Sequence, residues 1–246
     1  MQHPLTSDTK LPVIRILSEA CRLPVVHFCI LIKLCYPLLV MAALSIIASV
    51  VPALRDIQAE SVVLSVLTII LYLAALTMAA VRCHKVFLSP PHALHHVKAL
   101  HWNNPETRYF FAVVVLSIMV GILMGLFGIL LIPLSIASDR LIPLTFLLGL
   151  PIFYIFARFW LILPAYALGD KPEITHGWQL SEGNGWRLTL LLVVAPILGE
   201  CFLSLLPDTD TFFYALLTAS VELFVSVITL ALLSGGFNSE VQHEVC

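Results

Sequence analysis

The stretch YFFAVVVLSIMVGILMGLFGILL, from Tyr109 to Leu131, decides the fold class of this chain. It contains no Asp, Glu, Lys or Arg, and its apolar residues run continuously, without the alternation of a membrane β-strand. A helix needs about 20 apolar residues to cross roughly 30 Å of hydrocarbon. The stretch therefore predicts a transmembrane helix.

Five further stretches have the same character. Together the predicted spans lie at approximately 27–51, 61–81, 109–131, 141–163, 186–206 and 211–233. Of the 246 residues, 60% are hydrophobic and 11% are charged, and the mean hydropathy is +1.00. An ordinary soluble domain has about a quarter charged residues. We therefore predict a single all-α membrane domain over residues 1–246, a polytopic helix bundle of about six spans.

Lys and Arg are distributed unequally between the two sets of connections. The set on one side of the membrane holds only Arg55 and Arg140. The richer set comprises Lys10, Arg15, Arg22, Arg82, Lys85, Lys98, Arg108, Lys171 and Arg187. Because basic loops stay in the cytoplasm, we expect a multi-pass protein of a bacterial inner membrane with both termini cytoplasmic.

Two stretches of the basic side have the composition of helices that lie along a membrane surface. Leu11–Leu23 mixes aliphatic residues with Arg15, Glu19 and Arg22. Residues 172–181 are followed by Gly183, Asn184 and Gly185, which is a signal for the end of a helix. We expect interfacial amphipathic helices on the cytoplasmic side.

Four ionisable residues fall inside apolar stretches: Lys33, Arg158, Glu200 and Glu222. A charge within the membrane is costly, so each is a functional candidate. Counting the rise along each span predicts an ion pair between Lys33 and Glu222. These charges either lock the bundle, with Arg158 reaching phosphates or helix ends, or line a proton or ion path at Glu200 and Glu222. Arg158 is also a candidate for contact with a lipid phosphate.

The connection after the second span is rich in histidine. It contains His84, and HALHH at residues 92–96 has the H-x-x-H-H form of membrane di-iron enzymes. Those enzymes use many more histidines, whereas the other large loop offers only His176. A metal site there remains an alternative, and its candidate ligands are His92, His95, His96 and His101.

The third span carries Ser117, Gly121 and Gly125 at four-residue spacing, with Gly128 beyond. Small residues at this spacing let another helix approach closely. We expect this face to pack inside the bundle.

The six cysteines, at positions 21, 29, 35, 83, 201 and 246, form no C-x-x-C motif. We expect them to be small apolar side chains or reduced thiols and not a disulfide framework.

The string ARFWLILPAYALGDKPEITHGWQLSEGNGWRL resembles a motif of YciC-type six-span bacterial proteins and of the membrane domain attached to some glycerophosphodiester phosphodiesterases. CHKVFL at residues 83–88 is similar to the basic end of their second span. The matching positions are Arg158, Leu163, Pro164, Ala165, Trp178, Ser181, Gly183, Asn184, Gly185 and Trp186. The resemblance implies a six-helix inner-membrane fold and no established activity.

The chain contains no nucleotide-binding loop, hydrolase elbow or zinc-protease motif, and we expect no cofactor. With a net charge of −2 and dispersed basic residues, we expect no nucleic acid partner. The leading hypothesis is a non-enzymatic membrane protein that contacts phospholipids or other integral membrane proteins, for example as a subunit or assembly factor of a larger complex. The alternatives are a small transporter or lipid-translocating protein and a metal-dependent membrane enzyme that uses the His84–His101 loop.

Overall fold

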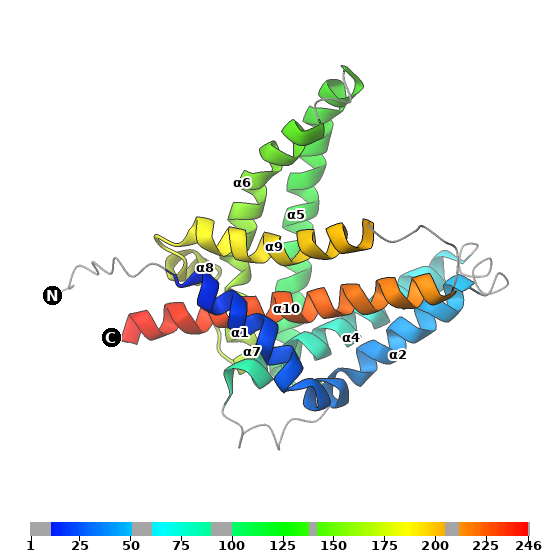
Figure 1. Cartoon of the computed structure of the whole chain (residues 1–246), viewed down its shortest axis with the longest axis horizontal. Coiled ribbons are helices and arrows are strands. Elements are labelled where there is room, and N and C mark those ends of the chain that lie inside the picture. Colours follow the sequence, from blue (N-terminus) through cyan, green and yellow to red (C-terminus); the bar gives the residue numbers. More distant parts are fainter. Residues whose placement is uncertain (1–10, 51–60, 90–99, 138–141, 205–211, 246) are drawn as a thin grey trace.

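The computed structural model describes residues 11–50, 61–89, 100–137, 142–204 and 212–245. These residues form helices joined by short turns, without a strand. The helices are α1 (Val13–Val26), α2 (Phe28–Val50), α4 (Val62–Leu88), α5 (Asn104–Ala137), α6 (Ile142–Trp160), α7 (Ile162–Leu168), α8 (Ile174–Leu180), α9 (Gly185–Ser204) and α10 (Phe212–Val245). The prediction of an all-α bundle is confirmed (Figure 1).

Six helical segments of the described ranges are long and apolar enough to cross a membrane. They are Phe28–Ile47, Val62–Leu88, Asn104–Ile129, Leu150–Leu168, Gly185–Ser204 and Leu216–Ser239. Each one overlaps a predicted span, which makes the chain a polytopic membrane protein. The fourth is broken at Leu161, where α6 gives way to α7.

Two spans extend well beyond their predicted ends. α4 continues to Leu88 and α10 to Val245, whereas the apolar pattern predicted ends at residues 81 and 233. Arg82, His84 and Lys85 therefore belong to α4 and not to the following connection. The physical reason is burial, because Arg82 and His84 lie inside the protein with hydrogen-bond partners and need no water.

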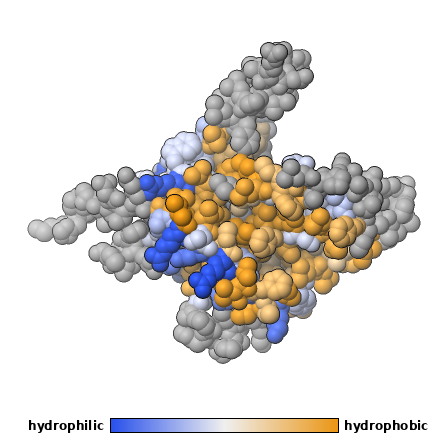
Figure 2. Space-filling model, viewed as in Figure 1, coloured by the Kyte–Doolittle hydropathy of each residue, from blue (hydrophilic) through white to orange (hydrophobic). Residues whose placement is uncertain are grey.

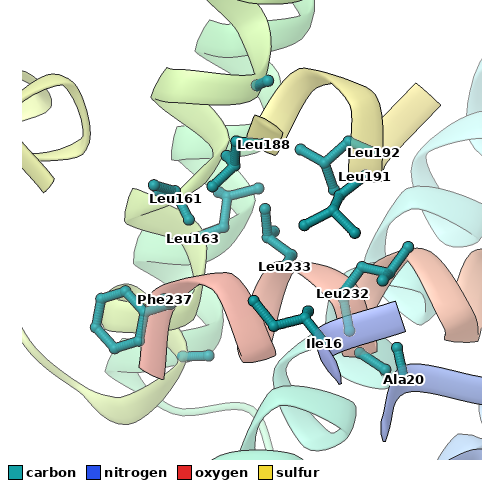
Figure 3. Packing of buried hydrophobic residues seen from close by; sticks show 14 of the residues in the cluster. Ile16, Ala20, Leu161, Leu163, Leu188, Leu191, Leu192, Leu232, Leu233 and Phe237 are labelled. Atoms are coloured by element: carbon teal, nitrogen blue, oxygen red, sulfur yellow. The ribbon is translucent and has the colours of Figure 1, made fainter. Parts of the chain in front are cut away.

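The buried core lies at one end of the bundle, which we call the packed end. There Val81 of α4, Leu161, Leu188 of α9 and Leu232 of α10 belong to one hydrophobic cluster. Figure 3 shows side chains of α1, α9 and α10 converging on this cluster. Ile16 and Ala20 of α1 join it, since α1 packs along α10.

The opposite halves of the helices diverge, and we call this the splayed end. α5 and α6 leave the group of α2, α4, α9 and α10 at a steep angle (Figure 1). Aliphatic side chains cover its outside, among them Val63 of α4, Ile129 of α5 and Leu198 of α9. Figure 2 shows this broad hydrophobic surface, whereas hydrophilic residues gather over α1. Such a surface suits lipid or other helices and not water.

The glycine face of α5 belongs to this open surface. A Cβ built on Gly121, Gly125 or Gly128 would meet nothing within 4 Å. The expectation that this face packs inside the bundle is therefore wrong. The reason is the divergence of α5 from its neighbours, which leaves this stretch of the helix without an opposing backbone.

The two amphipathic stretches form α1 and α8. In α1, Ile16, Ala20 and Pro24 face inward, and Arg15 and Glu19 form an exposed ion pair with Nε and Oε1 at 2.9 Å. α8 ends at Leu180, and the following turn contains Gly183 at φ 78°. A positive φ of this size suits glycine, which explains the stop signal.

Candidate functional site

Arg158, in the last turn of α6, is the centre of a buried polar cluster that we call the arginine cluster. Its Nε donates to Ser181 Oγ at 2.7 Å, its Nη2 to the carbonyl oxygen of Trp178 at 2.7 Å, and its Nη1 to Tyr154 Oη at 3.2 Å. The side chain is 6% exposed. A guanidinium tolerates such burial when its donors are used and a ring covers its face.

Aromatic rings complete the arginine cluster. The Arg158 guanidinium carbon lies 3.6 Å from the centroid of the Trp178 ring, a close cation–π contact. Tyr154 packs against Trp186 at 4.7 Å between ring centroids. Trp178 also contacts Phe159, with 5.9 Å between the centroids. The rings therefore bind α6 to α8 and to the start of α9.

Two glycines let the three helices approach each other. A Cβ on Gly177 would lie 2.7 Å from the carbonyl oxygen of Arg158, and one on Gly185 would lie 2.6 Å from the Tyr154 ring. Neither distance is possible for real atoms without movement of a neighbour. Glycine at these two positions is thus required by close approach, as in other helix contacts with small residues.

Asn184 joins the arginine cluster to the N-terminal segment. Its Oδ1 accepts from the backbone N–H of Leu11 at 3.0 Å, and its carbonyl oxygen accepts from Leu188 N at 3.1 Å in the first turn of α9. Arg187 Nη1 donates to the carbonyl oxygen of Leu11 at 3.4 Å. Asn184 therefore fixes both the start of α9 and the position of the segment before α1.

Part of the motif of the sequence resemblance thus meets in space around Arg158. Trp178, Ser181, Gly185 and Trp186 touch Arg158 directly or through Tyr154. Pro164 is buried in α7, and Gly183 provides the turn. Sequence reasoning did not single out Tyr154, which has no signal beyond its place one helical turn before Arg158.

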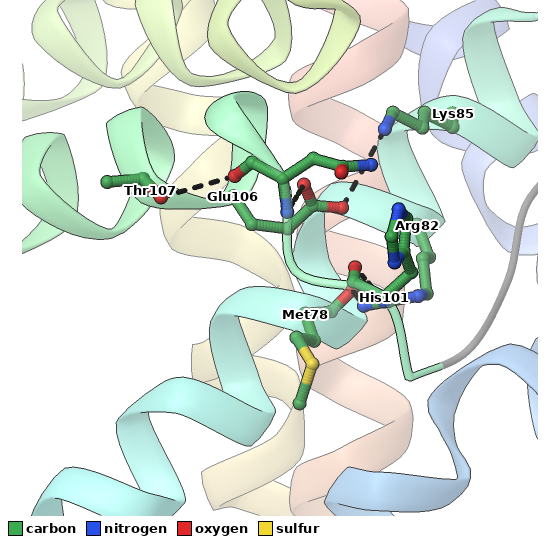
Figure 4. Close-up of polar contacts among 7 residues, drawn as sticks. Met78, Arg82, Lys85, His101, Glu106 and Thr107 are labelled. Carbon is green, nitrogen blue, oxygen red and sulfur yellow. Dashed lines mark hydrogen bonds and ion pairs between the residues drawn. The ribbon is translucent and has the colours of Figure 1, made fainter.

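A second polar cluster surrounds the end of α4, and we call it the α4 cluster. Arg82 is 1% exposed, and its guanidinium donates to the carbonyl oxygens of Met78 and, at 3.1 Å, His101 (Figure 4). The His101 side chain is exposed, so this histidine contributes a backbone oxygen to the cluster. Arg82 thereby ties the segment before α5 to α4.

Glu106 of α5 is the acidic member of the α4 cluster and is 2% exposed. Its Oε2 accepts from the backbone N–H of Asn103 at 3.1 Å, and its Oε1 lies 3.8 Å from Lys85 Nζ (Figure 4). A Glu at the third helical position that binds the N-cap N–H is one half of a capping box. Glu106 therefore begins α5 and pairs it with α4.

His84 joins three helices through its ring. Nδ1 lies 2.7 Å from Ser234 Oγ of α10, and Nε2 lies 3.2 Å from Tyr109 Oη of α5. Because the Ser234 hydroxyl donates to Leu230 O at 2.9 Å, it accepts from His84. We assign the neutral tautomer with the proton on Nδ1, so that Nε2 accepts from Tyr109.

The predicted ion pair between Lys33 and Glu222 is absent. Both residues belong to described helices, both are exposed, and the structure forms no ion pair between them. The reason is helical geometry, since α2 turns Leu34, Cys35 and Leu38 inward and Lys33 outward. The side chain of Glu200 lies outside the description.

The predicted histidine-rich loop does not begin at His84, because His84 is a buried residue of α4. His92, His95 and His96 lie outside the described residues. Within the described ranges no three His, Cys, Asp or Glu side chains gather as a metal site would require.

Two open hollows of the described surface have volumes of about 520 and 460 Å³. The first is lined by Trp102 to Pro105 and Thr107, and the second by residues of the 170–179 segment with Phe237 and Val241. Arg158, Lys33 and Glu222 line neither. The predicted charges therefore share neither of these two hollows.

Fold and clusters define a polytopic α-helical membrane protein whose spans are tied together at one end by buried arginines. No family model, curated protein or solved structure matches this chain. The assignment to YciC-type proteins therefore remains a prediction from the quoted motif.

Proposed function

We propose that the chain is a non-enzymatic integral membrane protein that works by binding another integral membrane protein at the outer surface of its helices. The observation that carries the proposal is the outward position of Glu222. It lies within the apolar segment Leu216–Ser239 of α10, is exposed, and has no ion-pair partner among the described residues. An ionisable group facing hydrocarbon is costly, and a polar group on a bound partner removes that cost.

The arrangement of the buried charges supports the same proposal. Arg82, Glu106 and Arg158 each hold one helix to another segment and lie at the packed end. Groups held in this way have a structural task. The splayed end, with exposed Val63, Ile129 and Leu198, leaves apolar surface for contact with a neighbour.

Photo-crosslinking tests this function in native membranes. We would place a benzophenone side chain at Ser226, which is exposed one turn from Glu222, and at Ile122 of α5 as the matched control. The expected result is one discrete protein adduct from position 226, several-fold weaker in the E222Q variant. Adducts with phospholipid alone from both positions would overturn the protein-partner proposal in favour of lipid handling. If the purified wild-type chain moved ions or lipids across vesicle membranes and the E222Q variant did not, this result would support a transporter instead.

We also propose a bacterial inner membrane as the location, with both termini and the packed end in the cytoplasm. The excess of Lys and Arg on one set of connections supports this orientation. Fusions after residue 246 test it, because green fluorescent protein is bright only inside and alkaline phosphatase is active only outside. A fluorescent and phosphatase-inactive pair is expected, and the reverse pair would refute the orientation.

A further inference from the structure

Two cysteines that are distant in sequence face each other inside the bundle. Cys35 of α2 and Cys83 of α4 are 48 residues apart, and their Sγ atoms lie 3.6 Å from each other. They are 6% and 1% exposed. Leu31, Leu34 and Val86 pack around them in a hydrophobic cluster of their own.

This geometry is close to that of a bonded pair. A disulfide has an S–S distance of about 2.05 Å, so the sulfurs need to approach by about 1.5 Å. α2 and α4 already pack along each other. The two sulfurs therefore belong to helices that are already neighbours.

A metal site is the competing reading of two adjacent thiols. Structural zinc needs four ligands. Within the described ranges no third His, Cys, Asp or Glu gathers with the pair. The ring nitrogens of the neighbouring His84 already bind Ser234 and Tyr109. The surroundings thus favour a reaction between the two sulfurs over metal binding.

We infer that Cys35 and Cys83 are an oxidation site, at which hydrogen peroxide converts two thiols into a disulfide that links α2 to α4. In the first step one sulfur attacks a peroxide oxygen, the O–O bond breaks, and a sulfenic acid and water form. In the second step the other sulfur attacks the sulfenic sulfur, the S–S bond forms, and the S–O bond breaks with release of water. The thiols lose two electrons and two protons, and peroxide is reduced to two molecules of water.

Two features of the site suit this chemistry. Peroxide is small and uncharged, so it can reach a buried pair that the large, charged glutathione cannot. Arg82, which precedes Cys83 in the chain, is buried as well. A nearby positive charge stabilises the negative charge on an attacking sulfur. The inference is independent of the proposed partner.

The other cysteines serve as internal references for the test. Cys21, Cys29 and Cys201 are exposed. Native membranes would be treated with dilute peroxide, free thiols would be alkylated after denaturation, and peptides would be analysed by mass spectrometry. We expect a linked peptide joining residues 35 and 83 that is reversed by dithiothreitol, with no linked peptide in C35A or in C83A.

Stability gives a second readout. It uses the wild-type chain, so no substitution can disturb folding. Closing a loop of this length should raise the midpoint of thermal unfolding by about 5 °C or more in the oxidised protein. Sulfinic or sulfonic acid at either cysteine without a linked peptide would overturn the inference. So would an unreacted pair that co-purifies with stoichiometric metal.

Discussion

The guanidinium of Arg158 lies over the indole ring of Trp178, 3.6 Å from its centroid, while its Nη2 donates to the carbonyl oxygen of the same residue at 2.7 Å. One residue of α8 therefore binds the arginine by its ring and by its backbone. These two contacts hold α8 in a fixed position against α6, although α8 is a short helix.

Replacing Arg158 should test this contact. In R158K an ammonium cannot reach Ser181, Trp178 and Tyr154 together, so we expect the free energy of unfolding to fall by about 3 kcal/mol. The measurement is the unfolding midpoint of purified protein in mild detergent. The control is R15K, because Arg15 is exposed and its ion pair with Glu19 contributes little. Equal effects of the two substitutions would contradict the locking role.

Glycines at close contacts should behave differently from glycines on the open face. G185A places a methyl group 2.6 Å from Tyr154, and we expect a loss of about 1–3 kcal/mol in the free energy of unfolding. G121A meets nothing within 4 Å and should be neutral or stabilising by up to about 1 kcal/mol, because alanine favours the helix. Both are read from the same thermal unfolding curves, and a destabilising G121A would indicate that α5 has a partner helix at that face.

Glu106 allows its capping role to be separated from its charge. E106Q keeps an acceptor for Asn103 N–H and loses only the attraction to Lys85, whose amino group is 3.8 Å away. We expect E106Q to cost less than about 1 kcal/mol and E106A about 1–3 kcal/mol, because E106A leaves the buried N–H without a partner. Chemical unfolding of both variants measures the difference. If E106Q were as costly as E106A, the ion pair and not the cap would dominate.

The coupling between His84 and Ser234 can be measured by a double-mutant cycle. The Nδ1–Oγ distance is 2.7 Å, and both side chains are buried. S234A leaves the His84 N–H without an acceptor, which should cost about 1–3 kcal/mol. We expect an interaction energy of about 1 kcal/mol or more between H84F and S234A in unfolding experiments. Additive effects would show that the hydrogen bond does not form.

The six spans could be predicted from the sequence because the membrane demands long apolar runs, and composition alone reveals them. The ends of α4 and α10 could not. Arg82 and His84 follow an apolar run and have the composition of a loop, yet burial with hydrogen-bond partners keeps them helical. Local polarity gives no information about a partner that lies far along the chain.

The candidate site could be predicted in part, because some of its contacts join residues that are close in the sequence. The arginine cluster is local, since Arg158, Trp178 and Ser181 are separated by at most 23 residues, and the motif drew attention to all three. The contacts of Cys35 with Cys83 and of His84 with Ser234 join different spans. When a helix is apolar on every side, its sequence does not specify which face meets which neighbour. The Lys33–Glu222 ion pair was predicted from the depth of the two residues in their spans. That prediction was wrong because depth does not tell which face of a helix meets a neighbour.

The contact between the first and last helices has a consequence for the order of biosynthesis. Leu11 binds Asn184, 173 residues later, and α1 packs on α10. During synthesis α1 lacks its main docking surface until α10 has left the ribosome. A nascent chain stalled before α10 should therefore leave α1 more open to protease, and full docking of α1 would report that α10 has been made.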